Sequence, residues 1–120
     1  MYVNGFVVPV REDMKDEYVA AARQFWDLAK DYGALGQVEC WEVDVKDGHT
    51  TDFRRAVQIE PGEKVVFSWV TWPDKATADK AEADMMTDER MAAFGDMPFD
   101  GKRLIFGGFE PVIELERGNG

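Results

Sequence analysis

The sequence has few of the residues that build covalent, metal and nucleic-acid sites. Its 120 residues include one cysteine, Cys40, and one histidine, His49. A lone cysteine forms no intramolecular disulfide, which fits a reducing compartment, and a lone histidine offers a zinc or haem site a single imidazole. Lys and Arg number 14 against 24 Asp and Glu, so the net charge of -10 repels phosphate backbones. We therefore expect no metal, no cofactor and no nucleic-acid partner.

Long apolar runs are also missing. None approaches the roughly 20 residues that a bilayer span needs, and residues 1–6 lack the basic region of a signal peptide. We therefore expect a cytoplasmic protein without membrane contact. Hydrophobic residues still make up 45% of the chain, which is typical of a globular protein. The sequence predicts a single domain over 1–116 and a flexible C-terminal tail over 117–120.

Hydrophobic periodicity predicts four main strands and two main helices. The clearest helix follows Glu12 and Asp13, where six apolar residues recur at steps of three and four: Met14, Tyr18, Ala21, Phe25, Leu28 and Tyr32. Strands are expected at 2–10, 35–45, 65–72 and 102–110, a second helix at 76–86, a short helix at 87–94, and short extended pieces at 53–59 and 112–116. The order β-α-β-β-α-β is the ferredoxin-like pattern, an α+β fold in which both helices cover one face of an antiparallel sheet.

The predicted strands are apolar on both faces. In the strand at 65–72, Phe67 and Trp69 alternate with Val66 and Val70. Two helices cover one face only, and an apolar second face needs a cover of its own. A second copy of the same sheet is the simplest cover. The pattern therefore predicts a homodimer whose sheets pack face to face, which is a dimeric α/β barrel.

Several segments resemble one known family. They are Tyr2-Val3-Asn4-Gly5-Phe6-Val7-Val8-Pro9-Val10, Val65-Val66-Phe67-Ser68-Trp69, Met97-Pro98-Phe99-Asp100-Gly101-Lys102-Arg103 and Gly107-Gly108-Phe109-Glu110. In this order they resemble the DUF1428 family, the small bacterial YbaA-like proteins, although the chain has Phe53-Arg54 where members often have Phe-Pro. The resemblance implies a dimeric α/β barrel related to antibiotic-biosynthesis monooxygenases, with no established function. Some members carry an RNA-related label, to which the acidity of this chain gives no physical support.

Strand alternation also suggests where a site lies. If Val38 and Cys40 face the helices, Glu39 points away from them into the barrel, where a carboxylate needs a partner. The same alternation places Arg103 on that side. The predicted cavity cluster is Asn4, Glu39, Trp41, Trp69 and Arg103. Two interpretations remain open, a ligand site and a structural ion pair at the dimer interface.

Four further residues are secondary candidates. His49 lies in a turn and is either a general base or a solvated side chain. Asp96 and Asp100 precede the last strand and either stabilise a turn or form a carboxylate pair at the cavity mouth. Lys102 is expected to face outward at the start of that strand.

The sequence leaves the function open between classes. In the first, the cavity between the sheets binds or oxidises a small aromatic or apolar molecule without a cofactor. In the second, the barrel is filled by its own side chains and the dimer is a non-catalytic module. RNA binding is a third hypothesis, and the net charge of -10 counts against it.

Overall fold

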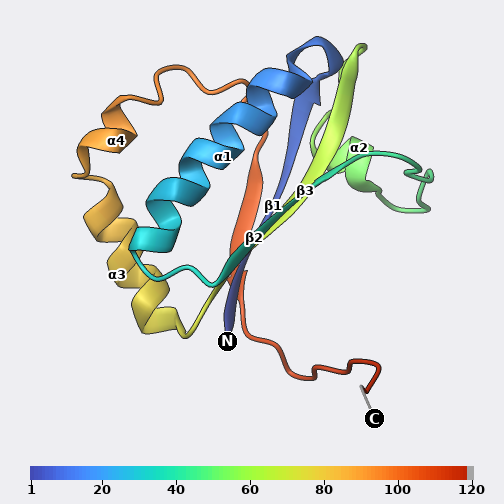
Figure 1. Ribbon diagram of the computed structural model, residues 1–120. Coiled ribbons are helices and arrows are strands. Elements are labelled where there is room, and N and C mark those ends of the chain that lie inside the picture. The colour runs from blue at the N-terminus through green and yellow to red at the C-terminus, as the bar shows by residue number, and fades with distance from the viewer. Residues whose placement is uncertain (119–120) are drawn as a thin grey trace.

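The computed structural model describes residues 1–118 and contains one sheet with its long helices on one side (Figure 1). Its elements in chain order are β1 (Tyr2–Arg11), η1 (Glu12–Met14), α1 (Lys15–Asp31), β2 (Gly36–Trp41), α2 (Phe53–Ala56), β3 (Glu63–Trp72), α3 (Lys75–Met85), α4 (Glu89–Ala92) and β4 (Ile105–Phe109). Helices α1, α3 and α4 lie on one side of the sheet, and α2 lies on the other (Figure 1).

The sheet has four antiparallel strands in the order β2-β3-β1-β4. Strands β1 and β3 pair over ten positions at the centre, and β2 and β4 are the edges. This topology confirms the ferredoxin-like α+β fold that the sequence predicts. None of the helices described within residues 1–118 is both long and apolar enough to cross a membrane.

The predicted apolar stripe of α1 faces the sheet. It buries Tyr18, Leu28 and Ala29, and Leu28 has no exposed surface at all. Helix α1 ends at Asp31, and Gly33 follows with a φ of 108°, a left-handed conformation that glycine adopts without steric cost. The amphipathic pattern is therefore sufficient to dock this helix on the sheet.

Each strand divides its side chains between a helix-facing side and an outer side. Val8 and Val66 are paired on the helix-facing side and almost fully buried, whereas Val7 and Phe67 are paired on the outer side. Between the strand ends, the outer face carries Val3, Gly5, Val7, Pro9, Val38, Cys40, Val65, Phe67, Trp69, Thr71, Ile105, Gly107 and Phe109. None of these side chains is charged, although charged residues make up 32% of the chain.

Several predicted boundaries are wrong. Residues 53–59 are not extended: Asp52 caps a helical turn by accepting the Arg55 N–H at 2.7 Å, which starts α2. Strand β2 ends at Trp41 because the next carboxylate, that of Glu42, accepts the Val65 N–H at 2.9 Å and the chain then leaves the sheet. Residues 112–116 form no strand. Of the tail predicted at 117–120, the last two residues lie outside the described part of the chain.

Candidate functional site

A small apolar cavity lies between α1 and the helix-facing side of the sheet. Its volume is about 150 Å³. Most of its wall is aromatic or aliphatic, with Phe6, Val8, Phe25, Val70, Phe99 and Leu104 among the lining residues. The rings of Phe99 and Tyr18 meet edge to face with centroids 6.1 Å apart. The cavity therefore presents an environment suited to a ring-sized apolar group.

One wall of this cavity is polar. The buried hydroxyl of Tyr18 donates a hydrogen bond of 2.6 Å to Glu39 Oε1. Partial burial raises the pKa of the Glu39 carboxyl above its ordinary value, against hydrogen bonds from Tyr18, Gln37 and Ser68 that lower it. Burial also raises the pKa of the Tyr18 hydroxyl, and so does its bond to Glu39. Glu39 remains solvent-exposed on its other side, so its carboxyl can exchange protons with water.

Gln37 completes the polar wall from the same strand. Its Nε2 donates to the Ala22 carbonyl at 3.1 Å and to Glu39 Oε2 at 3.2 Å. Its Oε1 is buried and has no hydrogen-bond partner among the described residues. A buried amide oxygen without a donor is costly, which makes it a natural acceptor for a ligand.

A larger chamber adjoins the small cavity. Its volume is about 480 Å³, and it lies between α3, α4 and the β1–β4 part of the sheet. Phe6, Phe25 and Leu104 line both spaces. In its wall the Trp72 indole N–H donates to Asn4 Oδ1 at 2.8 Å, and Asp79 and Glu82 also line it. We refer to the two neighbouring spaces together as the cleft between the sheet and the helix layer.

The prediction for the orientation of β2 is wrong. Glu39 points toward α1, as its bond to Tyr18 requires, and Val38 and Cys40 lie on the outer face. The sequence pattern misleads here because the outer face is the more apolar of the two along β2. A cavity site at Glu39 therefore lies on the helix side of the sheet and not between two sheets.

The predicted cluster is not brought together. Asn4, Glu39 and Trp41 share the helix-facing side, but Trp69 lies on the outer face beside Phe67, with ring centroids 5.4 Å apart. Trp41 packs against the core cluster around Val8 and has the Lys15 ammonium 5.2 Å from its ring centroid. Asn4 and Glu39 line different spaces of the cleft. Their roles in binding stay predictions.

Arg103 pairs with Glu63 instead of Glu39. Two guanidinium nitrogens reach the two Glu63 oxygens at 2.7 Å each, and Nε reaches Asp100 at 2.8 Å. The bond from Arg103 is the main reason that the pKa of the Glu63 carboxyl is lowered. This network holds the loop that carries Phe99 and Leu104 into the cleft, so Arg103 shapes the cavity without lining it.

The secondary candidates do not converge. His49 is exposed in the loop before α2, and Asp96 is exposed before β4. Asp100 stabilises its own turn by accepting the Lys102 N–H at 2.9 Å, and the Lys102 side chain is exposed. Within residues 1–118 no three His, Cys, Asp or Glu side chains are grouped to hold a metal ion.

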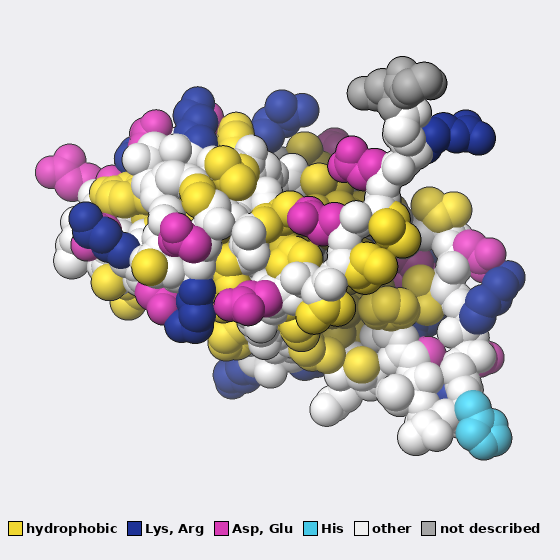
Figure 2. Space-filling view, turned by 90° about the horizontal axis from the view of Figure 1, so that it is seen from below, with side chains coloured by type: hydrophobic (Ala, Val, Ile, Leu, Met, Phe, Trp, Pro, Cys, Tyr) yellow, Lys and Arg dark blue, Asp and Glu magenta, His cyan; other side chains and the backbone are white. Residues whose placement is uncertain are grey.

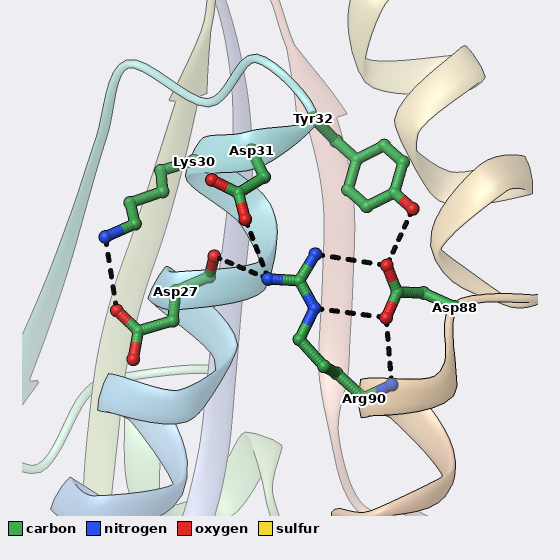
Figure 3. A network of polar contacts seen from close by, with 6 residues as sticks. All are labelled: Asp27, Lys30, Asp31, Tyr32, Asp88 and Arg90. Carbon is green, nitrogen blue, oxygen red and sulfur yellow. Dashed lines mark hydrogen bonds and ion pairs between the residues drawn. The ribbon is translucent and has the colours of Figure 1, made fainter.

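A second polar network joins α4 to the end of α1 (Figure 3). Arg90 donates to Asp31 at 2.7 Å and to the Asp27 carbonyl at 3.2 Å, and it also binds Asp88. The Tyr32 hydroxyl donates to Asp88 at 2.7 Å. The bonds from Arg90 hold the pKa of Asp88 well below its usual range. Arg90 is exposed, whereas the Asp88 side chain is mostly buried. Because the network joins α4 to the end of α1, we interpret it as a clamp that holds the helix layer over the larger chamber.

Sequence reasoning missed the partners of Glu39. Tyr18 belongs to the apolar stripe of α1, so the sequence pattern predicts only a core position for it. Ser68, in the middle of β3, is not among the predicted site residues. A signal was available in β3, where Ser68 interrupts a run of large apolar residues at a buried position. A buried hydroxyl in a central strand indicates a polar partner on the same face.

Comparison with known proteins places this chain in a family. A family model described as a protein of unknown function, DUF1428, matches residues 1–101. The chain belongs to the DUF1428 family. Among its DUF1428 relatives is the uncharacterized protein YbaA of Escherichia coli strain K12, which is 54% identical over 114 residues, or 94% of this chain and 97% of that protein.

Solved structures resemble the DUF1428 chain in fold alone. A dimeric ferredoxin-like protein from an uncultured marine organism has a TM-score of 0.60 at 10% identity and covers 98% of this chain and 100% of its own. A Bacillus cereus protein, provisionally named an antibiotic biosynthesis monooxygenase, has a TM-score of 0.56 at 11% identity with 97% of each chain covered. At such low identity the fold is shared and the activity does not transfer.

Proposed function

We propose that this protein binds a small molecule with an aromatic ring and a hydroxyl group in the cleft between α1 and the sheet. The observation that carries the proposal is the hydrogen-bonded Tyr18–Glu39 pair, 2.6 Å apart, at the wall of an otherwise apolar cavity of about 150 Å³. An apolar cavity of about this volume accommodates one benzene ring. The adjoining chamber of about 480 Å³ has room for a substituent.

The polar wall supplies acid–base chemistry to such a ligand. Tyr18 and Gln37 each donate to Glu39, which leaves other lone pairs of the carboxylate free to accept a ligand hydroxyl. A carboxylate with a raised pKa is a better proton acceptor than an ordinary glutamate, and its access to water lets the proton leave. Glu39 is thus our candidate general base, and Tyr18 the group that orients it.

The likeness in fold to the Bacillus cereus protein extends this proposal to one reaction class. Removing the proton of an aromatic hydroxyl enriches the ring in electrons, and an electron-rich ring is easier to oxidise. The enzymatic form of the proposal is therefore oxidation of the bound phenol by molecular oxygen, the co-substrate, without a cofactor. One oxygen atom enters the ring to give a quinone, and the other leaves as water. Binding without turnover is its alternative form.

We also propose that two copies associate through their outer faces, as a cytoplasmic homodimer. The uncharged outer face supports this, and so does the fold shared with a protein described as dimeric. Phe67 is 45% exposed and Phe109 is 62% exposed in the isolated chain. Exposing these apolar rings to water is unfavourable, and a partner that covers them would remove this cost. The single cysteine, Cys40, fits a reducing compartment.

A matched pair of ligands tests the binding site. We expect 4-ethylphenol to bind at least about tenfold more tightly than its methyl ether, because only the phenol donates to the charged Glu39, and hydrogen bonds to charged groups contribute about 1.5–3 kcal/mol. In Glu39→Gln the preference should shrink to less than about threefold, since the acceptor is then neutral. NMR titration measures both affinities.

Glu17→Gln is the control for this experiment. Glu17 lies exposed on α1, one residue before Tyr18, so this variant makes the same change in charge outside the cavity. It should retain the preference for the phenol. Equal affinity of the wild-type protein for the phenol and its ether, or no binding of either compound, would contradict the proposed site.

A further inference from the structure

The segment that follows β4 contains apolar side chains that are largely exposed in the single chain. Residues 110–118 contain no regular secondary structure, and they leave the sheet on the side opposite α1, α3 and α4 (Figure 1). Within this segment Val112 is 97% exposed, Ile113 is 70% exposed and Leu115 is 84% exposed. Three large aliphatic side chains within four residues are not left in water without a partner in most soluble proteins.

This segment is continuous with the apolar outer face. Phe109, the last residue of β4, lies on that face with its ring 3.4 Å from where a Cβ at Gly107 would stand, and 3.6 Å from one at Gly5. Figure 2 shows hydrophobic side chains gathered on the underside of the molecule and again along the segment that leads to the C-terminus. Beyond Glu110 and Pro111, the apolar character of the sheet surface resumes at Val112, Ile113 and Leu115.

We propose that residues 111–118 of one copy pack on the outer face of the second copy, as an arm of the dimer. This inference rests on the proposed dimer and adds a definite contact to it. The outer face has no charge between its strand ends, so it carries no carboxylate there to repel a segment that contains Glu114 and Glu116. The larger chamber on the helix side is a less favourable place for the arm, because Asp79 and Glu82 in its wall repel an acidic segment.

Truncation measures the contribution of the arm. A chain that ends at Glu110 should still dimerise, with a dissociation constant at least about tenfold higher than that of the full chain, because it loses the burial of Ile113 and Leu115. Sedimentation equilibrium over a range of concentrations measures both constants. An unchanged constant would overturn the arm and leave the dimer standing.

Thiol labelling then locates the arm. In a Cys40→Ser background, Ile113→Cys and Leu115→Cys place single thiols two residues apart, on the same side of an extended segment. Both should react with a thiol reagent at least about tenfold more slowly in the dimer than in the Phe67→Asp background, which removes the outer-face interface. Val43→Cys, on a loop residue that is 94% exposed, should react equally fast in both.

The outcomes separate this inference from the proposals on which it rests. Fast labelling at both arm positions in a stable dimer overturns the arm alone. A wild-type protein that is monomeric at micromolar concentration overturns the dimer and the arm together. Ligand binding in the helix-side cleft is measured independently and is affected by neither result.

Discussion

Replacement of Arg103 by alanine is expected to lower the free energy of unfolding by about 3 kcal/mol. The side chain of Glu63 is 8% exposed and depends on Arg103 for two hydrogen bonds of 2.7 Å. Breaking a buried ion pair from one side costs about 3–5 kcal/mol, because a charge stays buried without a partner. We expect the lower end of this range, since the pair lies near the surface. Urea denaturation of the two proteins gives the difference directly.

Two further variants make this result specific. Arg11→Ala breaks an ion pair with Asp13 in which both side chains are more than 60% exposed, and it should cost less than about 1 kcal/mol. The double variant Arg103→Met with Glu63→Leu removes both charges and should recover most of the lost stability. A loss below about 1 kcal/mol in Arg103→Ala would mean that the network does not hold the loop of Phe99.

Phe67→Asp is expected to raise the dissociation constant of the dimer at least about 100-fold. Phe67 lies near the middle of the outer face, between Phe53 at 6.0 Å and Trp69 at 5.4 Å, measured between ring centroids. In a dimer formed through this face, the new carboxylate would be buried without a partner, a cost of several kcal/mol. Light scattering and sedimentation should show a 13.6 kDa monomer at micromolar concentration.

The folded monomer should tolerate this substitution. Phe67 is 45% exposed in the single chain, so an aspartate there reaches water once the dimer separates. Circular dichroism checks that the variant is folded. Val43→Asp introduces the same charge on the exposed loop before α2 and should leave dimerisation unchanged. A Phe67→Asp protein that dimerises as tightly as the wild type would place the interface elsewhere.

The element order was accessible from the sequence because periodicity reports local structure directly. The α1 stripe and the two long central strands are strong patterns, and the ferredoxin-like topology follows from their order. The short helix α2 was not accessible, because its four residues carry no periodicity and depend on the cap at Asp52. Whether such a one-turn helix forms depends on single side-chain contacts, here the capping hydrogen bond of Asp52.

The face of β2 was the decisive error. The rule that apolar residues face the core assigns Val38 and Cys40 to the helices, but these residues lie on the outer face. The rule fails because the outer face is itself apolar, while the helix-facing side carries Gln37 and Glu39 at the cavity. In a strand with an apolar outer face and a polar site on its helix-facing side, the apolar residues no longer indicate which side faces the helices.

The partner of Arg103 could not be predicted from the sequence either. Alternation placed this arginine beside Glu39, but Arg103 precedes the first residue of β4, Ile105, and the chain has 24 Asp and Glu residues that could pair with it. Glu63 lies 40 residues away and meets Arg103 only after β3 and the loop before β4 are in place. Contacts of this range follow from the assembled sheet and not from local pattern.

The pKa of Glu39, measured with and without a ligand, tests the central claim most directly. Carbon-13 NMR of the side-chain carboxyl follows its titration. In the free protein we expect a pKa above the ordinary value of 4.5, because burial beside Tyr18 disfavours the charge. Saturating 4-ethylphenol should lower this pKa, since a donated hydrogen bond favours the charged form, and the phenol should correspondingly bind less tightly as the pH falls through it. A Glu39 that titrates at 4.5, and whose pKa the phenol leaves unchanged, would contradict a ligand site at the Tyr18–Glu39 pair.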